Sequence, residues 1–272
     1  MEQLEGRVAV ITGGGSGIGR GTALALARAK AVPIVVDIDG DRARAVEEEA
    51  RQLGVDAVGV ACDVTRDEDV VSLRDLALER FGRADIVMNN VSVIPIGRPE
   101  TLPMSEWQRA IDVNLLATIR SLQVFLPLFL EHGEGHVVNT ASTAGLFAYA
   151  YERLPYTATK AAVVAVSEAL ALYLRPKGIG VTCLCPGPTA TNIVEQIRFH
   201  DEVPLNSPGD LEIMDADTVG GMVVDAIREN TFLLLPHGDA VHDILVRRAQ
   251  DPEAFLAAQI EALTAKQDDA GG

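Results

Sequence analysis

Short apolar runs alternate with amphipathic segments along most of the chain. The apolar positions in each run are consecutive, which is typical of strands buried on both faces. These runs predict seven strands, over residues 7–12, 33–37, 57–62, 85–89, 136–141, 179–185 and 231–235. Between them, helical spacing of apolar residues predicts helices over residues 17–30, 41–53, 67–81, 105–130, 155–175 and 217–228. The pattern predicts an α/β fold of the Rossmann type, in which helices cover both faces of a doubly wound, seven-stranded parallel sheet.

Two segments depart from this alternation. Residues 186–215 are rich in Pro, Asn, Ser and Gly and are too long for an ordinary connection, so they predict a lid. Residues 239–266 follow the last strand and predict a helical C-terminal extension, broken near Asp251 and Pro252. We therefore expect one domain over residues 1–266, followed by a flexible tail over residues 267–272.

Composition narrows the classes of partner and the compartment. Hydrophobic residues make up 48% of the 272 residues, and the net charge is −16. That charge disfavours nucleic acid and anionic membranes as partners, because both would be repelled. The start of the chain is acidic, and charges or glycines interrupt the apolar runs, so we expect neither a signal peptide nor a membrane span. Cys62, Cys183 and Cys185 have the wrong spacing for a disulfide framework or a zinc site, which predicts a cytoplasmic protein with no bound metal.

A glycine-rich turn joins the first predicted strand to the first predicted helix. Backbone N–H groups and the dipole of the helix create a site for an anion such as a pyrophosphate. Glycines let the phosphates approach the backbone, because they carry no Cβ. The motif lies where a dinucleotide-binding fold needs it, so its residues are predicted to bind the cofactor. They are Gly13, Ser16, Gly17, Ile18 and Gly19.

Asp37 ends the second predicted strand. A carboxylate at this point accepts hydrogen bonds from the adenosine ribose hydroxyls and repels a 2′-phosphate. Ile38 follows Asp37, and Ser16 stands in the turn where a basic residue would help to hold that phosphate. The sequence therefore favours NAD over NADP.

Tyr156 and Lys160 are four residues apart in a predicted helix, which places them on one face. A free phenol has a pKa of about 10 and is a poor base at neutral pH. A nearby ammonium group stabilises the phenolate, so we expect Lys160 to lower the pKa of Tyr156. Tyr149 and Tyr151 have no lysine four residues later. By itself the pair is a common structural coincidence, and its weight depends on the motifs around it.

Together these motifs resemble the short-chain dehydrogenase/reductase family over roughly residues 5–235. The spacing of Thr12, Gly13, Gly17 and Gly19 is the family's spacing rather than the ordinary dinucleotide fingerprint. The resemblance extends to three further segments, the pairs Asp63-Val64 and Asn89-Asn90 and the segment from Pro186 through Gly187 and Thr189 to Thr191. Val91-Ser92 stands where the family has Ala-Gly, so we expect a different wall near the nicotinamide ribose.

The resemblance implies roles for individual residues. It implies a catalytic set in which Asn114 holds a water, Ser142 binds the substrate oxygen, Tyr156 transfers the proton and Lys160 assists it. It also implies further cofactor contacts, made by Asp63, Val64, Asn90, Tyr156, Lys160, Pro186, Gly187, Thr189 and Thr191.

The expected function is an NAD-dependent interconversion of a secondary alcohol and a ketone. The predicted pocket residues are mostly apolar, which favours a hydrophobic substrate, and they are Ile94, Ser142, Phe147, Tyr149 and Tyr156. Arg153 is the one basic residue nearby that could hold a carboxylate or phosphate.

Three alternatives stay open: an NADP-preferring carbonyl reductase, a dinucleotide-binding regulator without turnover, and a sugar-nucleotide epimerase or dehydratase. The last usually has a tighter glycine turn and a larger C-terminal domain than this chain. The resemblance also implies a homodimer or homotetramer.

Overall fold

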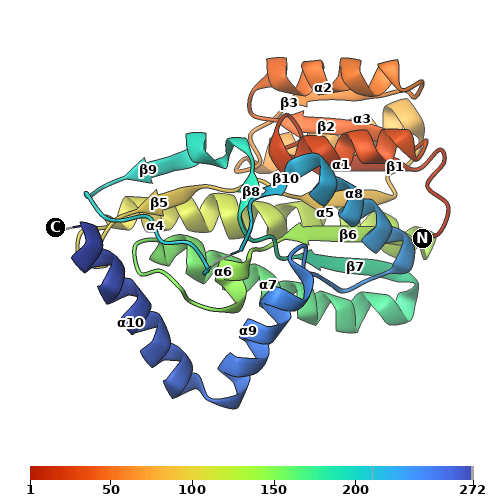
Figure 1. Ribbon diagram of the computed structural model, residues 1–272. Helices are drawn as coiled ribbons and strands as arrows, with labels where there is room; N and C mark the ends of the chain where they lie inside the picture. Colours follow the sequence, from red (N-terminus) through yellow and green to blue (C-terminus); the bar gives the residue numbers. More distant parts are fainter. Residues whose placement is uncertain (210, 271–272) are drawn as a thin grey trace.

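The computed structural model describes the backbone of residues 1–209 and 211–270. Its centre is a seven-stranded parallel sheet with the order β3-β2-β1-β4-β6-β7-β11 (Figure 1). These strands are β1 (Val8–Thr12), β2 (Val32–Asp37), β3 (Val58–Ala61), β4 (Ile86–Asn89), β6 (Gly135–Thr140), β7 (Ile179–Leu184) and β11 (Leu233–Leu234). The order runs outward from β1 and β4 in opposite directions, which confirms the predicted doubly wound sheet.

Helices cover both faces of the sheet, because each strand buries side chains on two sides. Ile11 and Val35 pack into one core with the layer of α1, α2 and α8. Val10 and Val36 pack into a second core with the layer of α3, α5 and α7. The helices are α1 (Gly17–Arg28), α2 (Gly40–Gln52), α3 (Asp67–Phe81), α5 (Ala117–His132), α7 (Leu154–Leu174) and α8 (Ala216–Glu229).

The helix predicted over residues 105–130 begins at Met104 and has a π-helical segment inside it. Helix α4 (Met104–Ala110) leads into the π-helix η1 (Ile111–Leu116), which continues as α5. A π segment inside an α-helix often marks a functional site, and this one carries Asn114.

The expectation that no segment is long and apolar enough for a membrane span was wrong. By length and composition, Met104–His132 and Leu154–Lys177 both meet that criterion. In the described structure both lie within the helical layer against the sheet. Helices of soluble proteins can satisfy the same criterion, so one or two such segments are weak evidence for a membrane location.

The predicted lid contains short strands near the carboxyl end of the sheet (Figure 1). Strand β8 (Thr189–Ala190) pairs with β10 (Met214–Asp215), and β9 (Ile197–Phe199) pairs with β5 (Ile94–Ile96). The 3-10 helix η3 (Asn192–Gln196) lies between β8 and β9. Two other short helices are α6 (Thr143–Leu146) and η2 (Arg175–Lys177).

The C-terminal extension forms two helices that meet at Asp251. Helix α9 (Gly238–Gln250) is anchored by the buried Val241, and α10 (Pro252–Ala270) follows. Phe255 of α10 packs edge-on against Phe147, with ring centroids 6.3 Å apart. The tail predicted from residue 267 is helical up to Ala270, and residues 271–272 lie outside the described residues.

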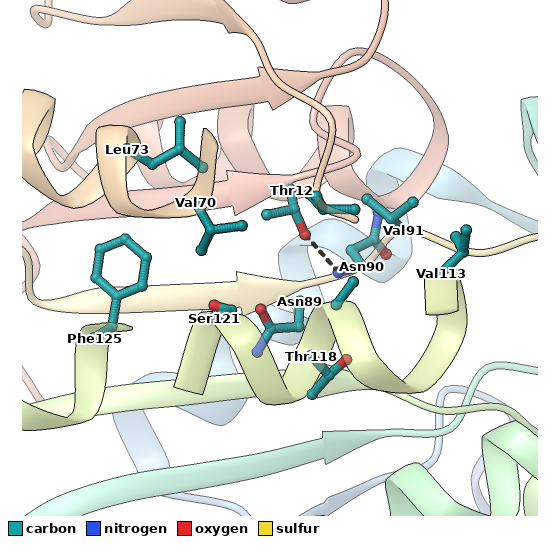
Figure 2. Close-up of a pocket in the computed structure, with 12 residues that line it drawn as sticks. Thr12, Val70, Leu73, Asn89, Asn90, Val91, Val113, Thr118, Ser121 and Phe125 are labelled. Carbon is teal, nitrogen blue, oxygen red and sulfur yellow. Dashed lines mark hydrogen bonds between the residues drawn. The ribbon is translucent and has the colours of Figure 1, made fainter. Parts of the chain in front are cut away.

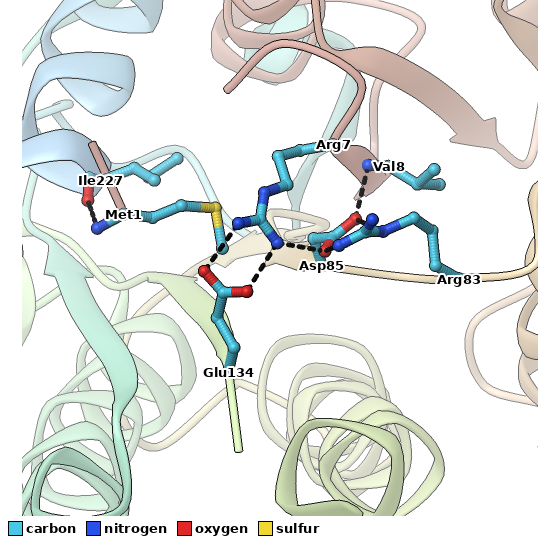
Figure 3. Close-up of polar contacts among 7 residues, drawn as sticks. All are labelled: Met1, Arg7, Val8, Arg83, Asp85, Glu134 and Ile227. Atoms are coloured by element: carbon cyan, nitrogen blue, oxygen red, sulfur yellow. Dashed lines mark hydrogen bonds and ion pairs between the residues drawn. The ribbon is translucent and has the colours of Figure 1, made fainter. Parts of the chain in front are cut away.

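Four charged residues form an ion-pair cluster at the amino ends of the central strands (Figure 3), which we call the amino-edge cluster. Its centre is Asp85, which is 5% exposed and accepts from the Val8 N–H at 2.8 Å and from Arg7 Nη1 at 2.9 Å. Arg83 also donates to Asp85, through Nε at 2.8 Å, and Arg7 reaches Glu134 at 2.7 Å. The cluster ties together the segments that lead into β1, β4 and β6.

Candidate active site

A cavity of about 750 Å³ lies at the carboxyl ends of the central strands. Ligands bind at this edge of doubly wound sheets, where the strand order reverses. One end of the cavity, which we call the Asp37 end, is lined by Asp37, Asp63 and Val64. The other, the Tyr156 end, is lined by Ser142 and Tyr156. The glycine turn lines the wall between β1 and α1.

The backbone of the glycine turn requires its glycines. Gly13 and Gly17 have φ values of +63° and +51°, in the left-handed region that favours glycine. A Cβ on Gly17 would lie 2.9 Å from Thr191 Cβ, so the turn and the lid approach closely. Gly19 does not line the cavity, and a Cβ there would overlap the Gly13 carbonyl. Gly19 therefore permits close packing beneath the turn, and its contact with the cofactor stays a prediction.

Asp37 is held by backbone donors. Its Oδ2 accepts from the Gly15 N–H, and its Oδ1 accepts from the Asp39 N–H, both at 3.0 Å. Both donors are neutral, so the negative charge stays available at the cavity wall. Nearby, hydrogen bonds from the Thr65 hydroxyl and N–H lower the pKa of Asp63.

Arg42 is a basic residue near Asp37 that the sequence did not reveal. It lies in the first turn of α2, lines the same cavity and pairs with Glu195 at 2.8 Å and with Asp39 at 3.4 Å. Ile38 follows Asp37 along the chain, but folding brings the guanidinium of Arg42 to the same end of the cavity.

Lys160 is buried at the Tyr156 end, with 1% of its surface exposed. Its Nζ donates to the Thr140 carbonyl at 2.6 Å and lies 5.8 Å from the centroid of the Tyr156 ring. Burial lowers the pKa of Lys160 to about 8, because the charged ammonium loses water.

Burial raises the pKa of Tyr156 to about 12, and a hydrogen bond with Ser142 acts in the opposite direction. The expectation that Lys160 lowers this pKa is not met, because the loss of water around the phenolate dominates. Ser142 also caps α6, since its Oγ accepts from the Ala144 N–H at 3.1 Å.

Asn114 supports the site from behind and does not line the cavity. Its Oδ1 accepts from the Val93 N–H at 2.8 Å and from the Ser92 hydroxyl at 3.3 Å. Its Nδ2 donates to the Val93 carbonyl at 3.0 Å and to Thr159 Oγ1 at 3.1 Å. The side chain therefore ties η1 to residues 92–93 and α7, and among the described residues its capacity is used. The predicted water cannot rest on this side chain as placed.

The predicted pocket residues separate into two groups. Ile94 and Tyr149 line the cavity. Phe147 does not, because it is 3% exposed and packs against Tyr149, at 6.0 Å between ring centroids, and against Phe255. Phe147 supports the wall rather than forming it. The remaining predicted cofactor contacts all line the cavity, namely Ser16, Ile18, Asn90, Pro186, Gly187, Thr189 and Thr191.

Asn90 joins the glycine turn to β6. Its N–H bonds the Thr12 hydroxyl at 3.1 Å, and its Oδ1 accepts from the Thr140 hydroxyl at 3.1 Å. Val91, where the resemblance expects alanine, lines both the large cavity and a small one behind it (Figure 2). The small cavity measures about 10 Å³, enough for one water molecule at most, so it is no ligand site.

Arg109, Arg198 and Asn206 also line the cavity, and sequence reasoning did not find them. They come from α4, from β9 and from the segment after β9. No spacing rule connects these positions, since the lid brings two of them to the site.

Comparison with known proteins places this geometry among oxidoreductases. The family model for the short chain dehydrogenases matches residues 7–202. An L-fucose dehydrogenase from Bos taurus is 37% identical over 200 residues, covering 73% of this chain and 72% of its own. A 1-deoxy-11-beta-hydroxypentalenate dehydrogenase from Streptomyces exfoliatus is 35% identical, covering 72% and 70%. Among solved structures, a short chain dehydrogenase/reductase from Burkholderia phymatum in complex with NAD has a TM-score of 0.83 and 31% identity, covering 93% and 96%.

Proposed function

Because the chain belongs to the short-chain dehydrogenase/reductase family of oxidoreductases, we propose that it interconverts a secondary alcohol and a ketone with NAD as its cofactor. The observation that carries this proposal is the cavity itself, which runs from Asp37 past the glycine turn to Ser142, Tyr156 and Lys160.

The residues present fit a dinucleotide. The left-handed glycines leave the turn without side chains that would keep a pyrophosphate from the backbone. The turn, with Ser16 and Ile18, would hold the pyrophosphate, and Asp37 would accept from the ribose hydroxyls. Family resemblance assigns the adenine to Asp63 and Val64. The remaining contacts would come from Asn90, Tyr156, Lys160, Pro186, Gly187, Thr189 and Thr191.

When bound, NAD supplies the nicotinamide ring that accepts or returns the hydride. The protein's part is to handle the proton. Tyr156 takes the proton of the substrate hydroxyl during oxidation and returns it during reduction. Ser142, whose hydroxyl lies against Tyr156, donates to the substrate oxygen, where charge develops. Lys160, fixed by the Thr140 carbonyl, favours the phenolate when it is charged.

The preference for NAD rests on Asp37, whereas Arg42 supports the alternative cofactor NADP. Arg42 is already paired with Glu195 and Asp39, which offsets its attraction for a 2′-phosphate. The charge of Asp37 has no such cationic partner among the described ion pairs.

The test replaces Asp37 by serine and compares NADH with NADPH. We expect the wild type to bind NADH more tightly, and Asp37→Ser to reduce that preference at least about tenfold, because the repulsion of the 2′-phosphate is lost. Fluorescence titration gives both Kd values, and a panel of secondary alcohols followed by NADH absorbance tests the reaction. Asp41→Ser, at an exposed position of α2, is the matched control. A wild type that prefers NADPH would contradict the choice of cofactor.

We also propose that the protein assembles with a second copy of itself through α5 and α7. Both helices are apolar over much of their length, yet less than half of the most apolar stretch in each is buried. Leu172 and Tyr173 at the end of α7 are 82% and 52% exposed. Apolar residues exposed together on helix faces are typical of an interaction surface.

A further inference from the structure

Three guanidinium groups line the Tyr156 end of the cavity. They belong to Arg109 on α4, Arg153 at the start of α7 and Arg198 on β9. The carboxylates that line the cavity within the described residues, Asp37 and Asp63, lie at the opposite end. In a chain with a net charge of −16, this wall is locally positive.

The acidic partners of these arginines lie behind the cavity wall. Glu106 is 7% exposed and pairs with Arg109 at 3.4 Å and with Arg198 at 3.3 Å. Glu152 is fully buried and pairs with Arg153 at 2.7 Å. Two carboxylates thus serve three guanidinium groups, which leaves one positive charge uncompensated.

Arg153 is fixed close to the reacting groups. It precedes Tyr156 by three residues at the start of the same helix, its Nη2 donates to the Asn206 carbonyl at 2.6 Å, and its guanidinium lies 5.4 Å above the Tyr149 ring. Its Nε–H is buried and has no acceptor within the described part of the chain. This arginine is held by its surroundings and still has a free donor.

We propose that the substrate is an anion, in which the reacting alcohol or ketone is joined to a carboxylate held by Arg109, Arg153 and Arg198. The inference rests on the proposed function for the reacting group and replaces the expectation of a purely hydrophobic substrate. Guanidinium groups bind carboxylates through charge-assisted hydrogen bonds, and three from separate elements orient the acid relative to Tyr156. A neutral alcohol would leave this positive charge unpaired.

The test compares octanoate with octanamide, two probes of equal length that differ in charge. Their Kd values are measured by calorimetry on the protein alone and on its complex with NADH. We expect octanoate to bind at least about tenfold more tightly, the effect of one hydrogen bond to a charged group.

Variants then locate the preference. Arg198→Gln should lower the ratio of the octanamide Kd to the octanoate Kd several-fold, toward a value of one. Arg198→Lys should preserve most of this ratio, because lysine keeps the charge. Arg109→Gln should act like Arg198→Gln, because both arginines share Glu106. Arg228→Gln, an exposed arginine of α8 paired with Asp225, is the matched control and should leave the ratio unchanged.

The two proposals fail in different ways. If NADH binds but octanoate binds no better than octanamide, the anionic substrate is excluded and the dehydrogenase assignment stands. A ratio unaltered in both glutamine variants also overturns the inference. If NADH does not bind, the proposed function fails, and the comparison on the protein alone still decides whether the wall selects an anion.

Discussion

The two edges of the central sheet use charge in opposite ways. At the amino edge, Asp85 accepts from the Val8 N–H and from two arginines, and Arg7 reaches a second carboxylate (Figure 3). At the carboxyl edge, Lys160 has one backbone acceptor among the described contacts, and Tyr156 is partly buried beside it. Burial lowers the pKa of Lys160 and raises the pKa of Tyr156, so it favours the neutral form of both side chains.

The difference separates stability from chemistry. Charges that satisfy one another hold the ends of strands together and leave nothing for a ligand. Polar groups that are buried with few partners cost stability, and they persist at sites where a ligand or a reaction uses them. Substitutions at the two edges should therefore affect different measurements, and the following predictions test that separation.

The largest effect is expected from Tyr156→Phe. Removing the hydroxyl removes the proton donor and acceptor, so turnover should fall by about 10³-fold or more. NADH affinity should stay within about twofold, because the ring and Lys160 remain. Steady-state kinetics and fluorescence titration measure both quantities. Tyr173→Phe makes the same chemical change at an exposed position of α7 and should keep full turnover. Substantial turnover in Tyr156→Phe would remove this tyrosine from the mechanism.

An intermediate effect, on stability alone, is expected from Asp85→Asn. The amide still accepts from the Val8 N–H but loses the charge that holds Arg7 and Arg83, so the free energy of unfolding should fall by about 2 kcal/mol. Urea unfolding measures this loss, and kcat/KM should stay within about twofold of the wild type.

Asp56→Asn is the control for Asp85→Asn. Asp56 pairs with Arg80 on the surface, and its side chain is 52% exposed. An exposed pair contributes little, so the loss should be below about 1 kcal/mol. Equal losses in the two variants would show that the amino-edge cluster has no special role in stability.

The fold was predictable from sequence because apolar periodicity determines which faces are buried. The seven strands and their parallel sheet follow from consecutive apolar runs such as residues 7–12. The π-helix around Asn114 was not predictable, because its residues have ordinary helical spacing and the contacts with Val93 and Thr159 come from other segments. The helices over residues 105–130 and 155–175 were predicted to within two residues at each end, but their apolar character was underestimated, since single charges such as Arg120 do not interrupt it.

The candidate site was predictable where its residues belong to a motif and not where they come from separate elements. The glycine turn, Asp37 and Tyr156 line one cavity as predicted. Phe147 was misplaced, because the C-terminal helix α10 covers it through Phe255, and no local pattern shows that contact. Arg198 reaches the cavity only because β9 pairs with β5.

For each unit of pH we expect an effect smaller than that of Asp85→Asn, and at the carboxyl edge pH changes activity and stability in opposite directions. The pKa of Lys160 is about 8, so the ammonium is lost above that pH, while Tyr156, with a pKa of about 12, stays protonated. Ketone reduction by NADH should therefore fall up to about tenfold for each pH unit above the Lys160 pKa. Lys160→Arg keeps its charge, so its activity, although lower, should show no such decline.

Stability should change in the opposite direction over the same interval. The folded pKa of Lys160 lies below the unfolded value of about 10.4, so between pH 8 and that value the unfolded chain binds more protons. The contribution of Lys160 to the free energy of unfolding therefore rises with pH, and Lys160→Met should lack this rise. Urea titrations at several pH values, read as the difference between wild type and Lys160→Met, measure it. The rate of ketone reduction and this stability difference could both stay constant from about pH 7 to about pH 10. Lys160 would then be fully charged in the folded protein, and the contrast between the carboxyl edge and the amino edge would be lost.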